Sequence, residues 1–545
     1  MKAKHLFPIL MMPLILSCSG QKAEADLILT NGHIYTVDPD FSVAEAMAIR
    51  NGRILATGTS EAISASYRAE RHKDLKGSFV YPGWIDAHCH FYGYGLSLNA
   101  VDLMESSSVE EIIERIKLHR KTHSGPWITG RGWDQNDWTE KAFPTRQMLD
   151  QHFPDTPILL RRIDGHAAWV NSKALELAGI TGKTDVEGGE ILLEEGKPSG
   201  ILIDNAIGLV RDLVPPPGLE EQTRALKAAQ EKCFSLGLTS VCDAGLDKAT
   251  VLLIDSLQQS GELLMRISTW LAPTEENFRH FVDKGPVQNE RLSINTIKLF
   301  ADGALGSRGA RMLSDYSDDP GNRGLLITDP DSLEAYCRRA YEHGFSIATH
   351  CIGDEANRQT LKRYAKILGG PNDRRWRIEH AQIIHPDDFH YFADYAIVPS
   401  VQTTHATSDM YWAGDRIGPG RMNGAYAYRK LLEQNGWLPN GSDFPVEYVN
   451  PLFGFYAGVV RKDRAGYPSG GFQMVDALTR EEALRAMTIW AARASFEEAF
   501  KGSLEAGKLA DFVITGTDLM KAPEDSLFAI PVEATYSGGK LVYQK

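Results

Sequence analysis

The sequence is poor in cysteine, and its few cysteines are not spaced like metal ligands or disulfide partners. Six cysteines occur in 545 residues. Apart from Cys18 near the N-terminus they number five, with neither a disulfide framework nor a Cys-x-x-Cys zinc motif. We expect these five to be buried free thiols, because a free cysteine packs as a small hydrophobic residue. A bridge between Cys233 and Cys242 in an oxidising compartment is the alternative.

The chain also lacks an excess of positive charge. Asp and Glu number 71 against 58 Lys and Arg, which gives a formal net charge of −13. Proteins that bind nucleic acid usually carry clustered basic charge, so no nucleic-acid partner is expected. The apolar and charged fractions are those of an ordinary soluble globular protein. The sequence gives no indication of oligomeric state.

The N-terminus has the pattern of an export signal. Lys2 and Lys4 precede an apolar run from Leu6 to Leu16, which is too short to cross a bilayer. The run ends at Cys18 in a sequence that resembles a bacterial lipobox, so residues 1–18 are predicted to be a signal peptide. We expect an exported protein at the periplasmic face, lipid-anchored to a bacterial membrane. A plain signal peptide without lipidation is the alternative.

Both ends of the mature chain predict small β-structures. Alternating runs flank Asn31-Gly32 and Asn51-Gly52 near the N-terminus, and Gly538-Gly539 near the C-terminus. Such dipeptides are strong signals for two-residue hairpin turns. Each end is too short for a convincing core of its own. Residues 26–78 and 500–545 are therefore predicted to form one composite β-sandwich, with the middle of the chain inserted between its halves.

The middle of the chain, residues 79–499, alternates strand-like and helical patterns, as parallel α/β proteins do. Eight runs qualify as core strands: 79–88, 239–244, 265–271, 296–300, 346–350, 375–380, 397–401 and 439–443. Eight such strands predict a (β/α)8 TIM barrel, whose active site lies at the C-terminal strand ends. An insertion at about 91–235, with strand-like runs at 127–132 and 158–163 and a hairpin at 189–203, is expected to shape the substrate pocket.

Metal-ligand side chains recur at the ends of these runs. His88 and His90 are two residues apart, so both point to the same side of a strand. His350, His380 and Asp443 stand at the ends of later strands. Imidazole nitrogen and carboxylate oxygen are ligands of Zn²⁺, and the strand ends of a closed barrel surround one mouth. The pattern therefore predicts a metal centre there.

Lys298 lies within a predicted barrel strand, although a protonated lysine cannot ligate a cation. Burial disfavours the charged ammonium group. The neutral amine can add carbon dioxide and form a carbamate, whose two oxygens can bridge two metals. The alternative is an ordinary buried ion pair between Lys298 and Asp302.

Five segments together resemble the amidohydrolase superfamily, and within it the amidohydrolase 3 branch that contains N-substituted formamide deformylase-like proteins. The segments are His88-Cys89-His90, Lys298-Leu299-Phe300-Ala301-Asp302-Gly303, His350-Cys351-Ile352-Gly353-Asp354, Arg377-Ile378-Glu379-His380 and Gly441-Ser442-Asp443-Phe444-Pro445. The resemblance implies that His88 and His90 bind one metal and that His350 and His380 bind a second. It further implies that Lys298 bridges them as a carbamate, and that Asp443 both ligates and carries the proton. Two Zn²⁺ ions are expected, with Fe, Co and Ni as alternatives.

The implied activity is metal-dependent hydrolysis of a C–N bond in a small N-substituted amide or an N-formyl or N-acyl compound. His166, Arg308, Gln402 and His405 are the candidate substrate contacts. Two alternatives stay open: an amino-heterocycle deaminase on the same fold, for which Glu355 could serve, and a lipoprotein that binds a solute without catalysis. Lys298 disfavours the deaminase.

Overall fold

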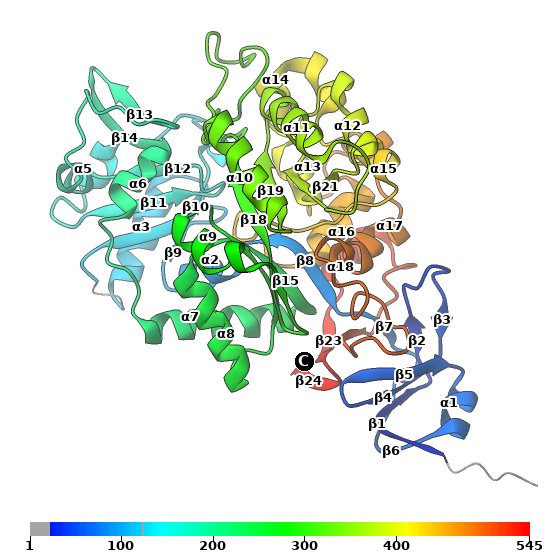
Figure 1. Ribbon diagram of the computed structural model, residues 1–545. Coiled ribbons are helices and arrows are strands. Elements are labelled where there is room, and N and C mark those ends of the chain that lie inside the picture. Colours follow the sequence, from blue (N-terminus) through cyan, green and yellow to red (C-terminus); the bar gives the residue numbers. More distant parts are fainter. Residues whose placement is uncertain (1–21, 123–124) are drawn as a thin grey trace, which may run out of the picture.

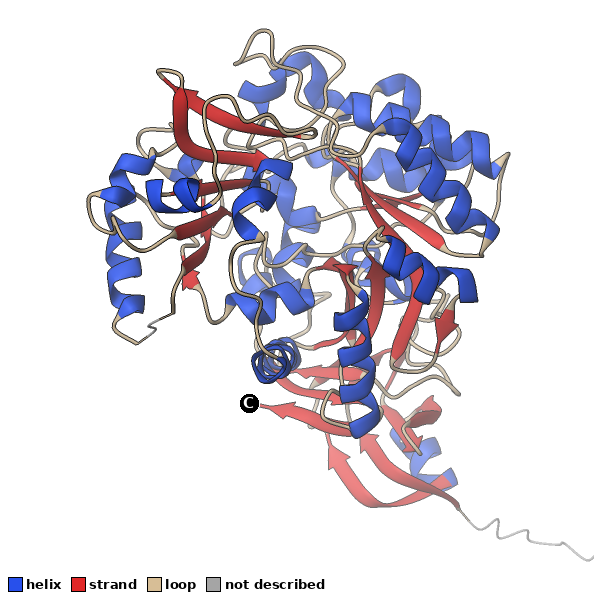
Figure 2. Ribbon diagram, turned by 60° about the vertical axis from the view of Figure 1, so that its left-hand side comes forward, coloured by secondary structure: helices blue, strands red, loops and turns tan. Residues whose placement is uncertain are grey.

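The computed structural model describes residues 22–122 and 125–545, and its strands form four sheets. A central barrel carries the inserted region on one side and a small β domain on the other (Figure 1, Figure 2). The predicted signal peptide lies outside the described residues. Within them, no helix is both long and apolar enough to cross a membrane.

Seven parallel strands form the wall of the barrel. In chain order they are β8 (Trp84–Cys89), β15 (Leu238–Leu246), β16 (Arg266–Leu271), β18 (Leu292–Phe300), β19 (Ser346–Cys351), β20 (Arg377–His380) and β21 (Val398–Ser400). β8, β16 and β19 are buried at every residue, as expected for parallel strands that are covered on both faces. The short antiparallel strand β17 (Val287–Gln288) pairs with β18.

Helices follow the barrel strands, as the alternating pattern predicts. Those longer than a single turn are α7 (Leu219–Ser235), α8 (Lys248–Ser260), α9 (Glu275–His280), α10 (Pro330–Glu342), α11 (Asp354–Leu368), α12 (His390–Asp394), α13 (Thr403–Asp409), α14 (Ala413–Arg421), α15 (Tyr428–Asn435), α16 (Pro451–Val460), α17 (Arg480–Ala486) and α18 (Ile489–Ala494). The prediction of a TIM barrel is confirmed.

The eighth predicted strand, residues 439–443, is irregular. It makes one isolated β-bridge, between Asn440 and Val401, the residue that follows β21. Its backbone nevertheless bonds on both sides, since Val401 N donates to Pro439 O at 3.0 Å and Asp443 N donates to His88 O at 2.7 Å. The segment thus fills the gap between β21 and β8 and completes the ring.

The first predicted strand, residues 79–88, is two strands that belong to different sheets. β7 (Phe79–Pro82) joins the β domain, and β8 begins the barrel. The chain crosses between them at Gly83, where a Cβ atom would lie 2.3 Å from Oγ1 of Thr239. Because both strands are largely buried, residues 79–88 read as one strand, and the sequence pattern does not reveal where the chain passes from one sheet to the other.

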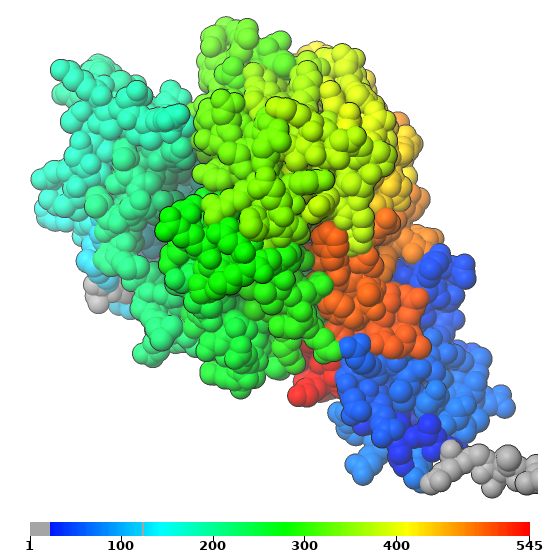
Figure 3. Space-filling model, viewed as in Figure 1, coloured from blue at the N-terminus to red at the C-terminus, as the bar shows by residue number. Residues whose placement is uncertain are grey.

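The β domain combines both chain ends, as predicted, and contains two sheets, the first of which consists of N-terminal strands only. One has the order β5 (Arg53–Gly58), β4 (Ala46–Arg50), β1 (Ala23–Thr30), β6 (Tyr67–Asp74). The other has the order β24 (Lys540–Gln544), β23 (Val532–Ser537), β22 (Phe512–Thr515), β7, β2 (His33–Tyr35), β3 (Val43–Ala44). One core cluster joins N-terminal residues such as Leu29 and Ile49 to C-terminal residues such as Phe512. In Figure 3 this domain projects from the barrel at the lower right.

Three of the four predicted hairpins are confirmed, including the one at 189–203, where β13 (Gly189–Glu194) and β14 (Lys197–Asp204) pair antiparallel. β4 and β5 pair around Asn51-Gly52, and β23 and β24 pair around Gly538-Gly539, with positive φ at all four turn residues. The hairpin at Asn31-Gly32 is wrong, because β1 and β2 lie in different sheets. The dipeptide there makes a corner, at which Asn31 alone has a positive φ.

The insertion forms a separate six-stranded sheet beside the barrel. Its order is β13 (Gly189–Glu194), β14 (Lys197–Asp204), β12 (Ala167–Val170), β11 (Ile158–Arg162), β10 (Ile128–Trp133), β9 (Val101–Asp102). The helices of this region are α2 (Phe91–Ser97), α3 (Val109–Arg120), α4 (Arg146–Asp150), α5 (Ser172–Leu177) and α6 (Asn205–Arg211). Trp133 and Trp169 pack in its core.

All five cysteines in the described residues are free and buried, as predicted. The alternative of a bridge between Cys233 and Cys242 is therefore wrong. Cys242 Sγ instead lies 3.3 Å from the hydroxyl of Ser495.

Candidate metal centre

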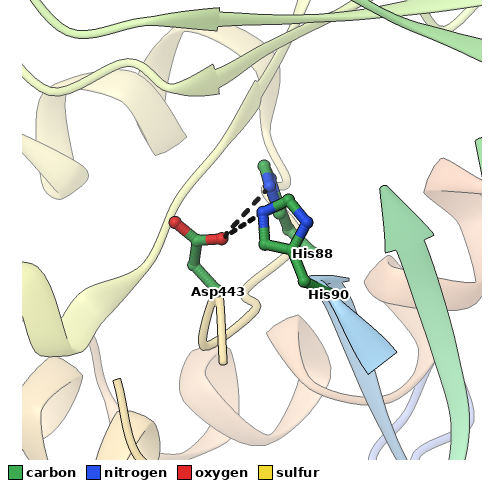
Figure 4. Close-up of side chains that lie close together, drawn as sticks. All are labelled: His88, His90 and Asp443. Carbon is green, nitrogen blue, oxygen red and sulfur yellow. Dashed lines mark ion pairs between the residues drawn. The ribbon is translucent and has the colours of Figure 1, made fainter. Parts of the chain in front are cut away.

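Three predicted ligands converge at the C-terminal end of β8. One carboxylate oxygen of Asp443, Oδ1, lies 3.2 Å from Nε2 of His90 and 3.4 Å from Nε2 of His88. Figure 4 shows the carboxylate of Asp443 pointing at both imidazole rings. Donor atoms of the three residues lie within 4.8 Å of one another, which suits a shared cation.

Further histidines continue the cluster around Asp443. Its other oxygen, Oδ2, lies 3.9 Å from Nε2 of His405. His380, His405 and Asp443 form a second group whose donor atoms lie within 4.8 Å of one another. The ring centre of His350 lies 4.5 Å from that of His380, and the ring centre of His380 lies 5.0 Å from that of His88. All five predicted His and Asp ligands therefore share one site.

A buried carboxylate holds the backbone around Asp443 in place. Asp86, on β8, accepts hydrogen bonds from the hydroxyl of Ser442 at 2.6 Å, from Ser442 N at 3.0 Å and from His88 N at 3.1 Å. Asp443 and His380 both have left-handed backbones, with φ of 60° and 72°. Such conformations cost roughly 1–3 kcal/mol each and persist where the surroundings enforce them.

Lys298 points into the same cluster. Its Nζ lies 3.0 Å from Nε2 of His88 and 4.8 Å from the ring centre of Phe300. Burial lowers the pKa of Lys298 to about 8. The alternative pairing with Asp302 is wrong, because Asp302 accepts hydrogen bonds from the backbone N–H groups of Arg311, Ile352 and Gly353. In the described chain, no carboxylate lies within 4.0 Å of Lys298 Nζ.

Glu379 belongs to the site, although the sequence analysis did not select it. Its Oε2 lies 2.6 Å from Nδ1 of His88, and both side chains are fully buried. Its Oε1 lies 3.7 Å from Nε of Arg377. A carboxylate on the second nitrogen of an imidazole fixes the tautomer and leaves the first nitrogen, Nε2, free to ligate.

The protonation of the cluster fits a bound cation. Burial lowers the pKa of His350 and of His380 well below the usual value, so both imidazoles are neutral and can ligate. Asp443 is ionised, because the neighbouring imidazoles hold its pKa well below the usual value although burial opposes this. Among the described residues, Asp443 Oδ1 and His380 Nδ1 are buried without a hydrogen-bond partner. These residues would hold a divalent metal.

Two cavities meet at the cluster. The aromatic cavity, of about 480 Å³, is lined by Tyr411, Trp412, Tyr448, Phe453 and Tyr456 among others. The arginine cavity, of about 440 Å³, is lined by Arg131, Arg161, His88, His90 and Lys298 among others. Both are lined by Asp164, His166, His350, His380, Asp443 and Val446. A substrate could therefore extend to both sides of Asp443.

Two of the four predicted substrate contacts reach these cavities. His166 lines both and forms an ion pair with Asp204, while His405 lines the aromatic cavity. Arg308 lines neither, because its guanidinium group pairs with Asp318 at 2.9 Å. Gln402 is buried and also lines neither cavity.

Glu355, the residue that supported the alternative of a deaminase, does not lie at the candidate metal centre. Glu355 accepts a hydrogen bond from Nε of Arg311 at 2.8 Å and lines neither cavity. The aromatic residues of the aromatic cavity come from the segments after β21 and around α16, which the sequence analysis did not single out.

A parallel barrel with imidazole and carboxylate donors at its C-terminal strand ends is the arrangement of metal-dependent hydrolases. The comparison with known families agrees with this class. A model described as "Amidohydrolase family" matches residues 72–543, and the chain belongs to this family.

Individual relatives extend over nearly the whole chain. Protein LONG AFTER FAR-RED 3 of Arabidopsis thaliana is 36% identical over 95% of this chain and 92% of its own length. N-substituted formamide deformylase of Arthrobacter pascens is 27% identical over 95% and 98%. The crystal structure of an uncharacterized metal-dependent hydrolase from Pyrococcus horikoshii OT3 is 28% identical, covers 91% of this chain and 99% of its own, and has a TM-score of 0.74. The resemblance predicted from the motifs is confirmed, and the protein is a hydrolase.

Proposed function

We propose that this protein hydrolyses the C–N bond of a small N-substituted amide, or of an N-formyl or N-acyl compound, with Asp443 as the group that moves the proton. The proposal is based on the position of the Asp443 carboxylate. This carboxylate stands where the two cavities meet, and its Oδ1 is buried without a hydrogen-bond partner among the described residues. A substrate spanning both cavities would place its central amide beside this oxygen.

In this proposal Asp443 acts first as a base and then as an acid. It accepts a proton from the attacking water and delivers it to the leaving nitrogen. A divalent metal held by the histidine cluster would supply Lewis acidity, which acidifies water and polarises a carbonyl group. His405, 3.9 Å from Asp443 Oδ2, and His166 line the cavities beside the reacting groups and are proposed to contact the substrate.

Lys298 is proposed to carry a carbamate that holds two metals together, with Zn²⁺ as the expected ion. Three observations support this: the pKa of Lys298 is lowered by burial to about 8, no carboxylate among the described residues pairs with it, and its Nζ lies beside His88. A neutral amine is the form that adds carbon dioxide. The metal content of the parent is expected to be two ions per chain. The metal content should be lower in K298A. Bicarbonate should promote metal reconstitution of the parent and not of K298A.

The proposed activity is tested by incubating the metal-loaded protein with N-formyl, N-acyl and cyclic amides and measuring the amine and the carboxylic acid released. D443N should lower kcat by ~10²–10⁴-fold, the range for lost acid–base catalysis, while keeping most of the metal. D388N is the matched control, since Asp388 is a buried aspartate that pairs with Arg358 outside both cavities. If D443N turns over as fast as D388N, the proposed role of Asp443 is wrong.

A further inference from the structure

The arginine cavity has two guanidinium groups facing it beside the candidate metal centre. Arg131 is on β10 and Arg161 is on β11, and the two residues are direct partners in the parallel pairing of these strands. Paired residues on neighbouring strands point to the same face of a sheet. Both side chains line the cavity that His88 and Lys298 also line.

The two guanidinium groups converge on the same small space. A Cβ atom placed on Gly165 would lie 3.2 Å from Nη1 of Arg131 and 3.2 Å from Nη2 of Arg161. Like charges this close repel each other in a partly buried site. Consistent with this, burial and then the charge of Arg131 lower the pKa of Arg161 to about 9.

Within residues 22–122 and 125–545, neither arginine has a carboxylate partner. Arg131 donates through Nη2 to Ile163 O at 2.9 Å, and Arg161 donates through Nη2 to Gly165 O at 2.9 Å. Among the described residues, Nε of each is buried without a hydrogen-bond partner, and no acidic oxygen lies within 4.0 Å of either guanidinium group. Arg211 also lines the cavity, but it pairs with Asp212.

The neighbouring Arg162, which lines the aromatic cavity, shows how this chain pairs an arginine with carboxylates. Its guanidinium group is fully buried and pairs with Asp134 and with Asp164, the latter at 2.6 Å. Asp164 and Asp443 are the acids that line the arginine cavity, and the two oxygens of Asp164 are engaged by Arg162 and by the backbone N–H of His166. Unlike Arg162, Arg131 and Arg161 have no carboxylate partner among the described residues, and both line the arginine cavity.

We propose that Arg131 and Arg161 bind a carboxylate group of the substrate, so that the protein acts on amides that carry a carboxylate, as N-acyl amino acids do. This inference rests on the proposed amide hydrolysis. Guanidinium groups bind carboxylates through paired, charge-assisted hydrogen bonds. A monoanion suits the site better than a phosphate dianion, because one donor of each arginine is already bonded to the backbone and Asp164 is close by.

The test compares two substrates that differ only in the carboxylate: an N-acyl phenylalanine and the corresponding N-acyl phenethylamine. The parent is expected to prefer the acid by ~100-fold or more in kcat/KM, and R131Q and R161Q should each lower this preference by ~10-fold or more, as expected for a lost charged hydrogen bond. R131K should retain part of it. R224Q, which changes an exposed arginine paired with Glu220 on α7, should leave the preference unchanged.

Binding without turnover provides a second measurement. In the D443N background, in which turnover is expected to be blocked, the N-acyl phenylalanine should raise the melting temperature. Adding R131Q to D443N should abolish this rise, and the phenethylamine analogue should raise the melting temperature of neither variant. Equal kcat/KM for the two substrates in the parent, or stronger competition by inorganic phosphate than by a carboxylate, would overturn the inference. If neither amide is hydrolysed but Arg131-dependent protection persists, the proposed hydrolysis fails and the carboxylate site stands.

Discussion

Replacing Glu379 by Gln tests whether the buried carboxylate behind His88 prepares the metal centre. The change keeps the shape of the side chain and removes its charge. In the parent, Oε2 of Glu379 lies 2.6 Å from Nδ1 of His88, with both groups inaccessible to solvent. The pKa of Glu379 stays below its usual value, since His88 and Arg377 favour the anion although burial opposes it.

The geometry sets the expected magnitude. A hydrogen bond to a charged group contributes about 1.5–3 kcal/mol and a neutral one about 0.5–1.5 kcal/mol. E379Q should therefore weaken the hydrogen bond that orients the imidazole ring of His88 by roughly 1–1.5 kcal/mol. That corresponds to ~10-fold in metal affinity, at the lower end of the ~10–100-fold range for groups that orient a ligand. E379Q also leaves Arg377 buried without an anionic partner, which should destabilise the fold by up to ~3–5 kcal/mol.

Metal affinity is measured by competition with a chromogenic chelator, and stability is measured in parallel by thermal melting. The matched control is E497Q, because Glu497 is a buried glutamate that pairs with Lys501 at 2.5 Å and lines neither cavity. E497Q should melt earlier than the parent and keep its metal affinity. If E379Q binds metal within twofold of the parent, Glu379 does not orient His88 and the reasoning is refuted.

Three further predictions concern other parts of the molecule. R266M or D511N should destabilise the protein by ~3–5 kcal/mol without changing kcat, because the buried bidentate pair of Arg266 and Asp511, at 2.6 Å and 2.9 Å, joins β16 to the β domain. Glu447 raises the pKa of His405 to about 9 against the opposing effect of burial. The stabilisation of the fold by this ion pair is therefore complete below pH ~6.5 and is lost as the pH rises through about 9. The melting temperature of E447Q should therefore lie below that of the parent at pH 6 and approach it at pH 10; a constant difference would contradict this. C18A should move the exported protein from the membrane fraction to the soluble fraction, and an unchanged distribution would contradict lipidation.

The barrel and most of the candidate ligands could be predicted because they depend on patterns within single strands. Parallel strands buried on both faces are rich in apolar residues, and the candidate ligands lie at or near the C-terminal ends of such strands. His88, His350 and His380 are the last or second-to-last residues of their strands, and Lys298 lies two residues before the end of β18. The crossing at Gly83 could not be found in this way, since β7 and β8 together look like one apolar run.

The groups around the ligands were missed for a different reason. Glu379 and the arginine pair act through contacts between strands, and their position depends on register and side-chain direction. Arg161 and Arg162 are neighbours in the sequence, yet Arg161 lines the arginine cavity without a carboxylate partner among the described residues, whereas Arg162 lines the aromatic cavity and pairs with two aspartates. Alternation along β11 separates the two side chains, but only a known register shows which cavity each one faces. Arg308 was predicted to contact the substrate because it follows a barrel strand. In the structure its guanidinium group pairs with Asp318.

The failure of the eighth strand to form a regular ladder explains how Asp443 reaches the histidines. A regular strand would continue the pleat, whereas Asp443 has a left-handed backbone and its N–H bonds to His88 O at 2.7 Å. The preceding residue, Ser442, is held by Asp86 from β8, the strand that carries His88 and ends just before His90. One short segment therefore supplies both histidines and the anchor that turns Asp443 towards them. The backbone strain at Asp443 is tolerable because these buried hydrogen bonds enforce it. The irregularity in the barrel wall and the convergence of the candidate ligands are consequences of one local arrangement.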